Sequence, residues 1–432
     1  MTGSRWRPFL PKTVTVLSEG YRPADLRADA LAGLTVAIIA LPLAMALAIA
    51  SGAPPERGLV TAIVAGFLIS LLGGSRHQIG GPTGAFVVVV FNVIAVHGYD
   101  GLLLATLMAG ALLVAAGLAR LGTWIKYIPD PVVTGFTTGI AVIIFSSQVG
   151  ELFGLSTGSL PAEVGGKWQA FWQARATMNP WSVAIAGGVL GSILLMRRLA
   201  PRAPAFLVSV AAASALVALF DLPVDTIGSR FGEIRAAIPW PALPPVSADR
   251  LRELMPSAFT IAFLAGVESL LSAVVADGMT GRRHRSNGEL VAQGIANMAS
   301  AVFGGLPATG AIARTATNIR SGARSPVAGM LHAVFLLAFL LTLAPLTVYI
   351  PLASLAAVLV VVAWNMAEFP RFRRLLGAPA GDRMVLVLTF ALTVLVDLTV
   401  AIEVGVVMAS MLFMHRMAEA VAVDGGPRLF EE

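Results

Sequence analysis

Apolar runs long enough to cross a membrane recur along nearly the whole chain, and charged residues lie mostly in the short breaks between them. Hydrophobic residues make up 57% of the 432 residues and charged residues 12%. Soluble domains carry about 45–50% apolar and about 25% charged residues, so this chain has too little charge to cover a surface that faces water. Because a spanning helix needs about 20 residues, the pattern predicts an all-α polytopic membrane protein.

Charges and turn residues divide the chain into fourteen apolar segments. The first seven are residues 30–50, 57–73, 83–97, 101–119, 132–150, 180–197 and 203–220. The second seven are residues 256–276, 287–303, 309–320, 326–344, 350–364, 383–396 and 399–415. Some of these segments, notably 83–97, 309–320 and 383–396, are too short to span a bilayer alone.

The positions of lysine and arginine predict the orientation of the segments. If the N-terminus is inside, the cytoplasmic parts hold 22 of these residues and the outside loops hold seven. This bias places both termini in the cytoplasm and favours an even number of helices in a bacterial inner membrane. The net charge of +6 then reflects basic loops facing the cytoplasm and anionic lipid, and no nucleic-acid partner is expected.

The two halves of the sequence repeat one interruption. Gly-Pro-Thr-Gly-Ala at residues 81–85 opens the third segment, and Pro-Ala-Thr-Gly-Ala at residues 307–311 opens the tenth. Thr83 and Thr309 are 226 residues, or seven segments, apart. Since seven is odd, the second copy enters the membrane from the opposite side. The chain is therefore expected to form a 7+7 inverted repeat with half-helices at segments 3 and 10.

These paired interruptions predict an anion site. The glycines and prolines before Thr83 and Thr309 cannot continue a helix, so each segment should enter as extended chain and start a helix near the middle of the bilayer. A helix start carries unpaired N–H groups and a partial positive charge. Two facing starts would bind an anion, with both threonines as N-caps or hydroxyl donors. The alternative is that the interruptions only help the helices to pack.

Two charged residues lie at the depth of this predicted site. Arg314 either attracts the anion or pairs with Glu268, which lies in the middle of an apolar segment. A carboxyl group there can take up a proton because burial disfavours its charged form. Glu268 is therefore a candidate coupling residue, with a structural ion pair to Arg314 as the alternative. Residues 40–46 of the first segment are rich in alanine, and this stretch is expected to line the site with Ala44 and Met45.

Several other kinds of function have no supporting motif. The chain has no cysteine, which excludes disulfides and thiolate chemistry. Its histidines have no neighbouring ligands at metal-binding spacing, and no phosphate-binding loop for an ATP-driven pump occurs. No nucleophile–base pair is evident either. We therefore expect neither an enzyme nor a cofactor or metal.

Several motifs, in their order along the chain, resemble the sulfate permease (SulP) family of anion transporters, which is solute carrier family 26-like. The main ones are residues 40–46 (ALPLAMA), 80–85 (GGPTGA), 266–272 (GVESLLS) and 309–315 (TGAIART). The likeness extends from about residue 20 to about residue 417. The resemblance implies a substrate site made by Thr83, Gly84, Ala85, Phe86, Gly310, Ala311 and Arg314.

The resemblance also implies a domain plan. A tail of residues 1–28 would precede a transmembrane domain of residues 29–417, and residues 418–432 would follow as a cytoplasmic tail. The core would comprise about 29–119 and 256–344, and the gate about 132–220 and 350–415. Family members are typically homodimers with a cytoplasmic STAS domain after the last helix. The given sequence stops at Glu432, so either it was cut before such a domain or this member lacks one.

The expected function is secondary active transport of a small anion of the sulfate, bicarbonate or dicarboxylate class. The Glu268 match resembles bacterial members thought to be proton-coupled, which favours symport with protons. An anion channel or an uncoupled anion exchanger is the alternative. A nucleobase permease fits less well, because Arg314 and the two Thr-Gly starts suit an anion better than a neutral ring.

Overall fold

The computed structural model describes residues 7–123, 129–158, 160–161, 163–200 and 203–396, with short pieces between 400 and 414. Of the predicted last segment, residues 399–415, about half of the residues are described, in separate short pieces. Residues 1–6 of the predicted N-terminal tail lie outside the described ranges. The predicted C-terminal tail, residues 418–432, lies wholly outside them.

Helices account for nearly all of the regular structure. In the first half these are α1 (Lys12–Glu19), α2 (Pro23–Ala50), α3 (Pro55–Leu72), α4 (Val87–Leu118), α5 (Asp130–Phe153), α6 (Val164–Ala174), α7 (Pro180–Leu199) and α8 (Ala205–Phe220). In the second half they are α9 (Ile227–Phe231), α10 (Ala248–Thr280), α11 (Ser286–Val302), α12 (Ile312–Arg320), α13 (Val327–Leu343), α14 (Leu352–Met366), α15 (Phe369–Leu376) and α16 (Ala380–Leu395). Two short strands, β1 (Gly80–Gly81) and β2 (Thr309–Gly310), lie among them.

The predicted fold class is confirmed: the chain is an all-α polytopic membrane protein. Within the described residues, eight helical stretches are long and apolar enough to cross a membrane, and α8 is a shorter apolar helix. The first thirteen predicted segments each overlap a helix. The third and fourth share α4, which is interrupted at Gly98 with φ of 70°. The count of fourteen spans remains a prediction.

Local sequence explains where several helices begin and end. Pro129 and Pro131 suit the start of α5, since proline fixes a helical φ and has no N–H to leave unpaired. Gly154 ends α5 in the left-handed conformation that glycine adopts easily. At the start of α10 the Ser247 hydroxyl accepts a bond from the Arg250 amide.

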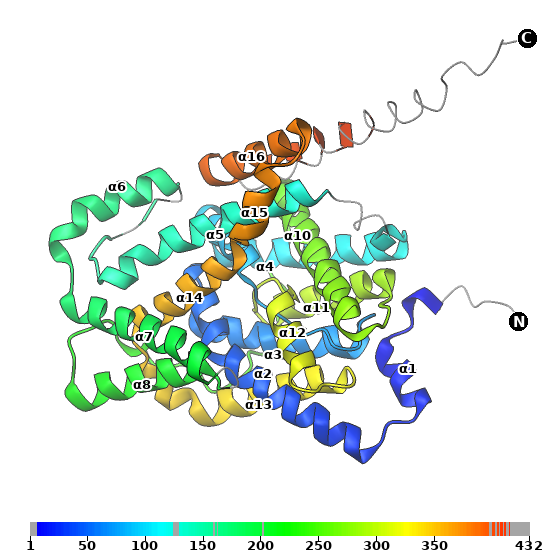
Figure 1. Cartoon of the computed structure of the whole chain (residues 1–432), viewed down its shortest axis with the longest axis horizontal. Helices are drawn as coiled ribbons and strands as arrows, with labels where there is room; N and C mark the ends of the chain where they lie inside the picture. The colour runs from blue at the N-terminus through cyan, green and yellow to red at the C-terminus, as the bar shows by residue number, and fades with distance from the viewer. Residues whose placement is uncertain are drawn as a thin grey trace, which may run out of the picture.

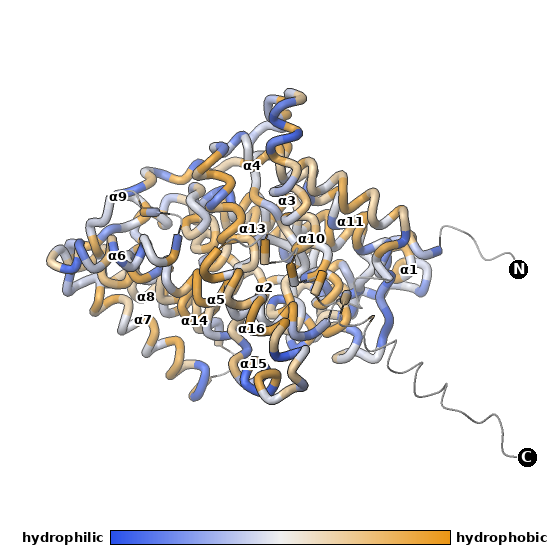
Figure 2. Tube along the Cα trace, turned by 90° about the horizontal axis from the view of Figure 1, so that it is seen from above, coloured by the Kyte–Doolittle hydropathy of each residue, from blue (hydrophilic) through white to orange (hydrophobic). Residues whose placement is uncertain are grey.

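Helices from the two halves of the chain pack against each other throughout. α4 packs on α10 and α11, and α2 and α3 pack on α13. In both views α1 and α6 lie at opposite ends of the longest axis (Figures 1 and 2). Exposed apolar side chains on α7 and α8 suit contact with lipid: Leu194, Leu195, Leu199, Leu219 and Phe220.

Glycines set the close approach of α4 to α11, and this contact yields a stability prediction. A Cβ added at Gly110 would lie 2.6 Å from the Gly294 carbonyl oxygen. Gly110→Leu should therefore destabilise the protein by about 1–3 kcal/mol through overpacking. Gly188→Leu on α7, where nothing lies within 4 Å of the added Cβ, is the matched control. Thermal melting of both variants in detergent tests this, and equal melting temperatures would contradict the packing account.

Candidate functional site

The two interrupted segments cross one another as a two-stranded antiparallel sheet. Gly80 of β1 pairs with Gly310 of β2, and Gly81 pairs with Thr309. The Ala311 amide extends the ladder by donating to the Ile79 carbonyl at 2.9 Å. Because the strands are antiparallel and a helix follows each directly, the two helices leave the crossing in opposite directions. Their N-termini therefore start close to the same point.

The helix starts differ in detail from the prediction. The first begins as a short 3-10 turn, η2 (Gly84–Phe86), which leads into α4. Thr83 takes the N-cap position, but its hydroxyl makes no capping bond. In the second copy Ala311 is the N-cap of α12 and Thr309 belongs to the strand. The sheet pairing causes this shift, because it holds Thr309 and Gly310 extended.

Side chains from the second half of the chain reach the first helix start. The Thr83 hydroxyl donates a hydrogen bond of 2.8 Å to Oε2 of Glu268 on α10. The Arg314 guanidinium donates through Nη2 to the Pro82 carbonyl. Within the described residues no ion pair joins Arg314 to Glu268. The structural ion pair, which the sequence left open, is therefore absent from this structure.

Arg314 is a buried cation, and one of its guanidinium nitrogens is left without an acceptor among the described residues. Its side chain is only 5% exposed, and its Nη1 atom has no hydrogen-bond partner in the described part of the chain. The guanidinium lies against Gly81, where an added Cβ would come within 2.4 Å of Nη1. A buried charged donor without a partner is costly, so an acceptor arriving at this place would be stabilised.

A cavity of about 570 Å³ opens onto both helix starts. From the predicted site it is lined by Thr83, Gly84, Ala85, Ala311, Arg314 and Glu268. Arg197, Arg320 and Arg371 also line it, and because all three are exposed to solvent we call their end of the cavity its mouth. These three arginines belong to parts of the chain that the charge bias places on the cytoplasmic side.

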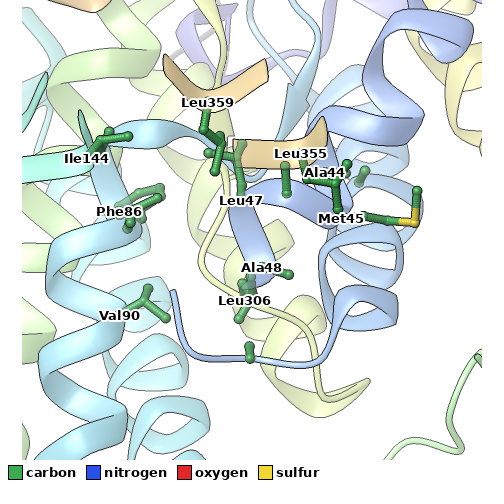
Figure 3. Packing of buried hydrophobic residues seen from close by; sticks show 14 of the residues in the cluster. Ala44, Met45, Leu47, Ala48, Phe86, Val90, Ile144, Leu306, Leu355 and Leu359 are labelled. Atoms are coloured by element: carbon green, nitrogen blue, oxygen red, sulfur yellow. The ribbon is translucent and has the colours of Figure 1, made fainter. Parts of the chain in front are cut away.

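Five of the predicted site residues do not line this cavity. Phe86 packs beside Val90 and Ile144 (Figure 3), and is 2% exposed. Thr309 and Gly310 are buried in the sheet, where the Thr309 hydroxyl donates to the Ala265 carbonyl at 2.8 Å. Ala44 and Met45 are each 1% exposed and lie in the core cluster of Figure 3.

Other residues of α2 take the place expected of Ala44 and Met45. Val36, Ile39, Leu43 and Leu47 line the cavity at helical spacing. The face of α2 that carries Ala44 packs instead on α3. There an added Cβ at Gly58 would lie 2.0 Å from the Ala44 carbonyl oxygen.

A buried polar network behind the sheet has no counterpart in the sequence analysis. At its centre the Glu289 carboxylate accepts bonds from the Gly74 amide at 2.8 Å and the Ser75 amide at 3.1 Å. Ser269 donates to Glu289 at 3.2 Å, and the Gln78 amide donates to Ser269 at 2.7 Å. The chain of bonds fixes Gln78, which packs directly on Gly310.

A second link ties the tenth segment to the sheet. Thr315 on α12 accepts a bond from the Ile79 amide at 3.1 Å and another from the Ser272 hydroxyl at 3.0 Å. Both links hold the crossing of β1 and β2 in place. Among the described residues no group of three or more histidine, aspartate or glutamate side chains could hold a metal ion.

This architecture defines a class of membrane transporter: helical, with two interrupted segments that cross beside an internal cavity. The chain belongs to the sulfate permease family, whose sequence model matches residues 26–389. It is accordingly a transporter rather than an enzyme, and the family supports an anion as its substrate. The predicted family membership is confirmed.

Relatives and solved structures agree with this assignment. The chain is 45% identical to the putative sulfate transporter YvdB of Bacillus subtilis over 94% of this chain and 77% of that one. It is 34% identical to the bicarbonate transporter BicA of Picosynechococcus over 91% of this chain and 71% of the relative. The transmembrane domain of a cyanobacterial BicA superposes with a TM-score of 0.80 at 32% identity, over 90% of this chain and 98% of that one.

A more distant structure shares the fold alone. SLC26A9 superposes with a TM-score of 0.86 at 18% identity, over 95% of this chain and 68% of that one.

Proposed function

We propose that the protein is a proton-coupled secondary transporter of a small anion of the sulfate, bicarbonate or dicarboxylate class. The observation that carries this proposal is the arrangement at one cavity of two helix starts, a buried arginine and a carboxyl group. The names of the relatives, a putative sulfate transporter and a bicarbonate transporter, support the choice of anion.

The proposed anion site comprises the first amides of η2 and α12 together with Arg314. Gly84 and Ala85 supply amides on one side, and Ile312 and Ala313 on the other. Helix-start amides have no partner in their own helix and carry partial positive charge. The free Nη1 of Arg314 adds a full charge. Such a site suits an oxyanion, because oxyanions offer several acceptor oxygens.

Glu268 is the proposed proton site. When the carboxyl group is charged, it offsets the charge of Arg314 and repels an anion in the same cavity. When it is protonated, Arg314 alone sets the charge and the cavity attracts an anion. Proton and anion therefore favour each other's binding, which is the condition for symport. The bond from Thr83 to Glu268 brings the proton site into direct contact with the first helix start.

Movement of the predicted core against the predicted gate would carry the site across the membrane. The packing supports this grouping: α2, α3, α4, α10, α11 and α13 pack on one another, whereas α5 packs on α14 and α16. The arginines at the cavity mouth indicate a conformation open to the cytoplasm. An inner-membrane location, cytoplasmic termini and a homodimer remain part of this proposal.

A flux panel in proteoliposomes tests the proposal. We expect labelled sulfate, bicarbonate or a dicarboxylate to enter with saturation and to accumulate when the lumen is alkaline. Saturable flux that is the same with and without a pH gradient would indicate an uncoupled exchanger. A linear anion current far above transporter turnover would indicate a channel. Competition by uracil would indicate a nucleobase permease, and each of these three outcomes would overturn the proposal.

A further inference from the structure

Lys167 on α6 is a largely buried cationic residue that does not line the cavity. Its side chain is 4% exposed. Among the described residues its ammonium group takes part in no ion pair. The contact that the ammonium makes is with the ring of Phe91, whose centroid lies 4.7 Å from Nζ. Burial lowers the pKa of Lys167, since the charged form loses its water.

The location of Lys167 relates it to the proposed anion site. Phe91 lies on the half-helix that begins at Gly84, seven residues further along and so about 10 Å away along the axis. α6 follows the end of α5, whereas the start of α5 lines the cavity through Val132 and Thr137. Lys167 therefore lies beyond the anion site, on the side opposite the mouth of the cavity.

The contact between Lys167 and Phe91 also joins two parts of the molecule that are expected to move. α6 packs on α5 of the predicted gate, whereas Phe91 belongs to α4 of the predicted core. The Phe91 ring in turn lies beside the turn between α2 and α3, where an added Cβ at Gly52 would be 3.5 Å from it. For the site to open on the side of α6, α6 and α4 must separate. This separation would release the ammonium group of Lys167 from the Phe91 ring.

We propose that Lys167 is an anion-capture residue for the face that is closed in this structure. While that face is closed, the ammonium is held on the Phe91 ring, which a cation contacts favourably. When the face opens, the charge becomes available to attract a small oxyanion toward the helix starts, about 10 Å away along the half-helix. This inference rests on the proposed transport function and identifies the second entrance of the same site.

Transport measured separately from each face of the membrane in the Lys167→Met variant tests the inference. Methionine keeps most of the apolar contact and removes the charge. Uptake of labelled sulfate, bicarbonate or a dicarboxylate, whichever the wild type transports, is measured in vesicles of each orientation. We expect the KM at the α6 face to rise about tenfold and the KM at the other face to stay unchanged. Lys167→Arg, which keeps the charge, should restore the wild-type KM.

Arg175 offers a matched control. Arg175 follows α6 directly, is exposed, and holds its guanidinium 4.7 Å from the ring centroid of Trp172. Arg175→Met therefore removes the same charge from the same region without touching Phe91, and it should leave both KM values unchanged. An equal rise in both variants would show that only the overall charge of this face matters, and would overturn the inference.

The same measurement distinguishes anion capture by Lys167 from a structural role in which Lys167 only holds the α6 face closed. If Lys167 only holds the face closed, Lys167→Met would favour opening and lower the KM at the α6 face. A lower or unchanged KM there would overturn the inference. Absence of saturable uptake by the wild type would instead contradict the proposed function, so the two failures are distinguishable.

The absence of native cysteines allows a second, independent test with one variant. In Lys167→Cys, a membrane-impermeant thiol reagent carrying a quaternary ammonium group should restore the low KM at the α6 face. A reagent carrying a sulfonate should raise the KM further. Equal effects of the two reagents would show that side-chain size rather than charge matters, and would overturn the inference.

Discussion

Replacing Glu268 with glutamine should abolish anion accumulation driven by a pH gradient while anion exchange continues. Glutamine has nearly the shape of the protonated side chain and can still accept the bond from Thr83, but it cannot release a proton. A gradient of one pH unit is worth about 1.4 kcal/mol per proton, or about a tenfold concentration ratio. The wild type should approach that ratio, and the Glu268→Gln variant should stay near one.

Thr83→Val is the control for this experiment. It removes the hydroxyl that donates to Glu268 but keeps the titrating carboxyl group. We expect it to weaken apparent anion affinity and to retain accumulation. If Glu268→Gln still concentrates the anion with an unchanged pH dependence, Glu268 is not the coupling residue. Loss of accumulation in both variants would show that the Thr83–Glu268 contact is required in addition to the titrating carboxyl group.

Gly310→Ala should nearly eliminate transport although the site residues themselves are intact. A Cβ at this position would lie 1.6 Å from Nε2 of Gln78, so the Gln78 side chain must move and give up its bond to Ser269. The crossing of β1 and β2 then shifts, and with it both helix starts. A displacement of about 1 Å in a preorganised site can cost about 100-fold in rate, and we expect a loss of that size in uptake.

A double variant tests the stated cause of this loss. Gln78→Ala removes the atoms that the new Cβ would strike, so adding it to Gly310→Ala should recover part of the transport. Gly191→Ala on α7, which has nothing within 4 Å of the added Cβ, should behave as the wild type. Normal uptake by Gly310→Ala alone would mean that the helix starts tolerate movement and that the anion binds elsewhere.

The interruptions were predictable from sequence because glycine and proline limit the backbone directly. Gly81 and Pro82 cannot continue a helix, and their repetition before Thr309 revealed the second break. The pairing of the two breaks was not predictable, because a ladder of two residues in each strand has no periodicity to detect. That pairing moved the second helix start from Thr309 to Ile312.

The cavity-facing side of α2 could not be predicted for a different reason. A helix that is apolar all round has no polar face to indicate its rotation, so Ala44 and Met45 were as plausible as Leu43 and Leu47. Packing decides the rotation instead, through the close contact between Ala44 and Gly58. The role of Glu289 was not predictable, because two of its partners, the amides of Gly74 and Ser75, are about 215 residues away in sequence and leave no local pattern.

The central claim is that an anion binds between the starts of η2 and α12, and anomalous scattering can locate it. Selenate has the shape and charge of sulfate, and selenium gives an anomalous signal in crystals grown with it. We predict a peak within hydrogen-bond distance of the amides of Ala85 and Ala313 and of Nη1 of Arg314. A selenate peak confined to the cavity mouth, at Arg197, Arg320 and Arg371, would contradict the account.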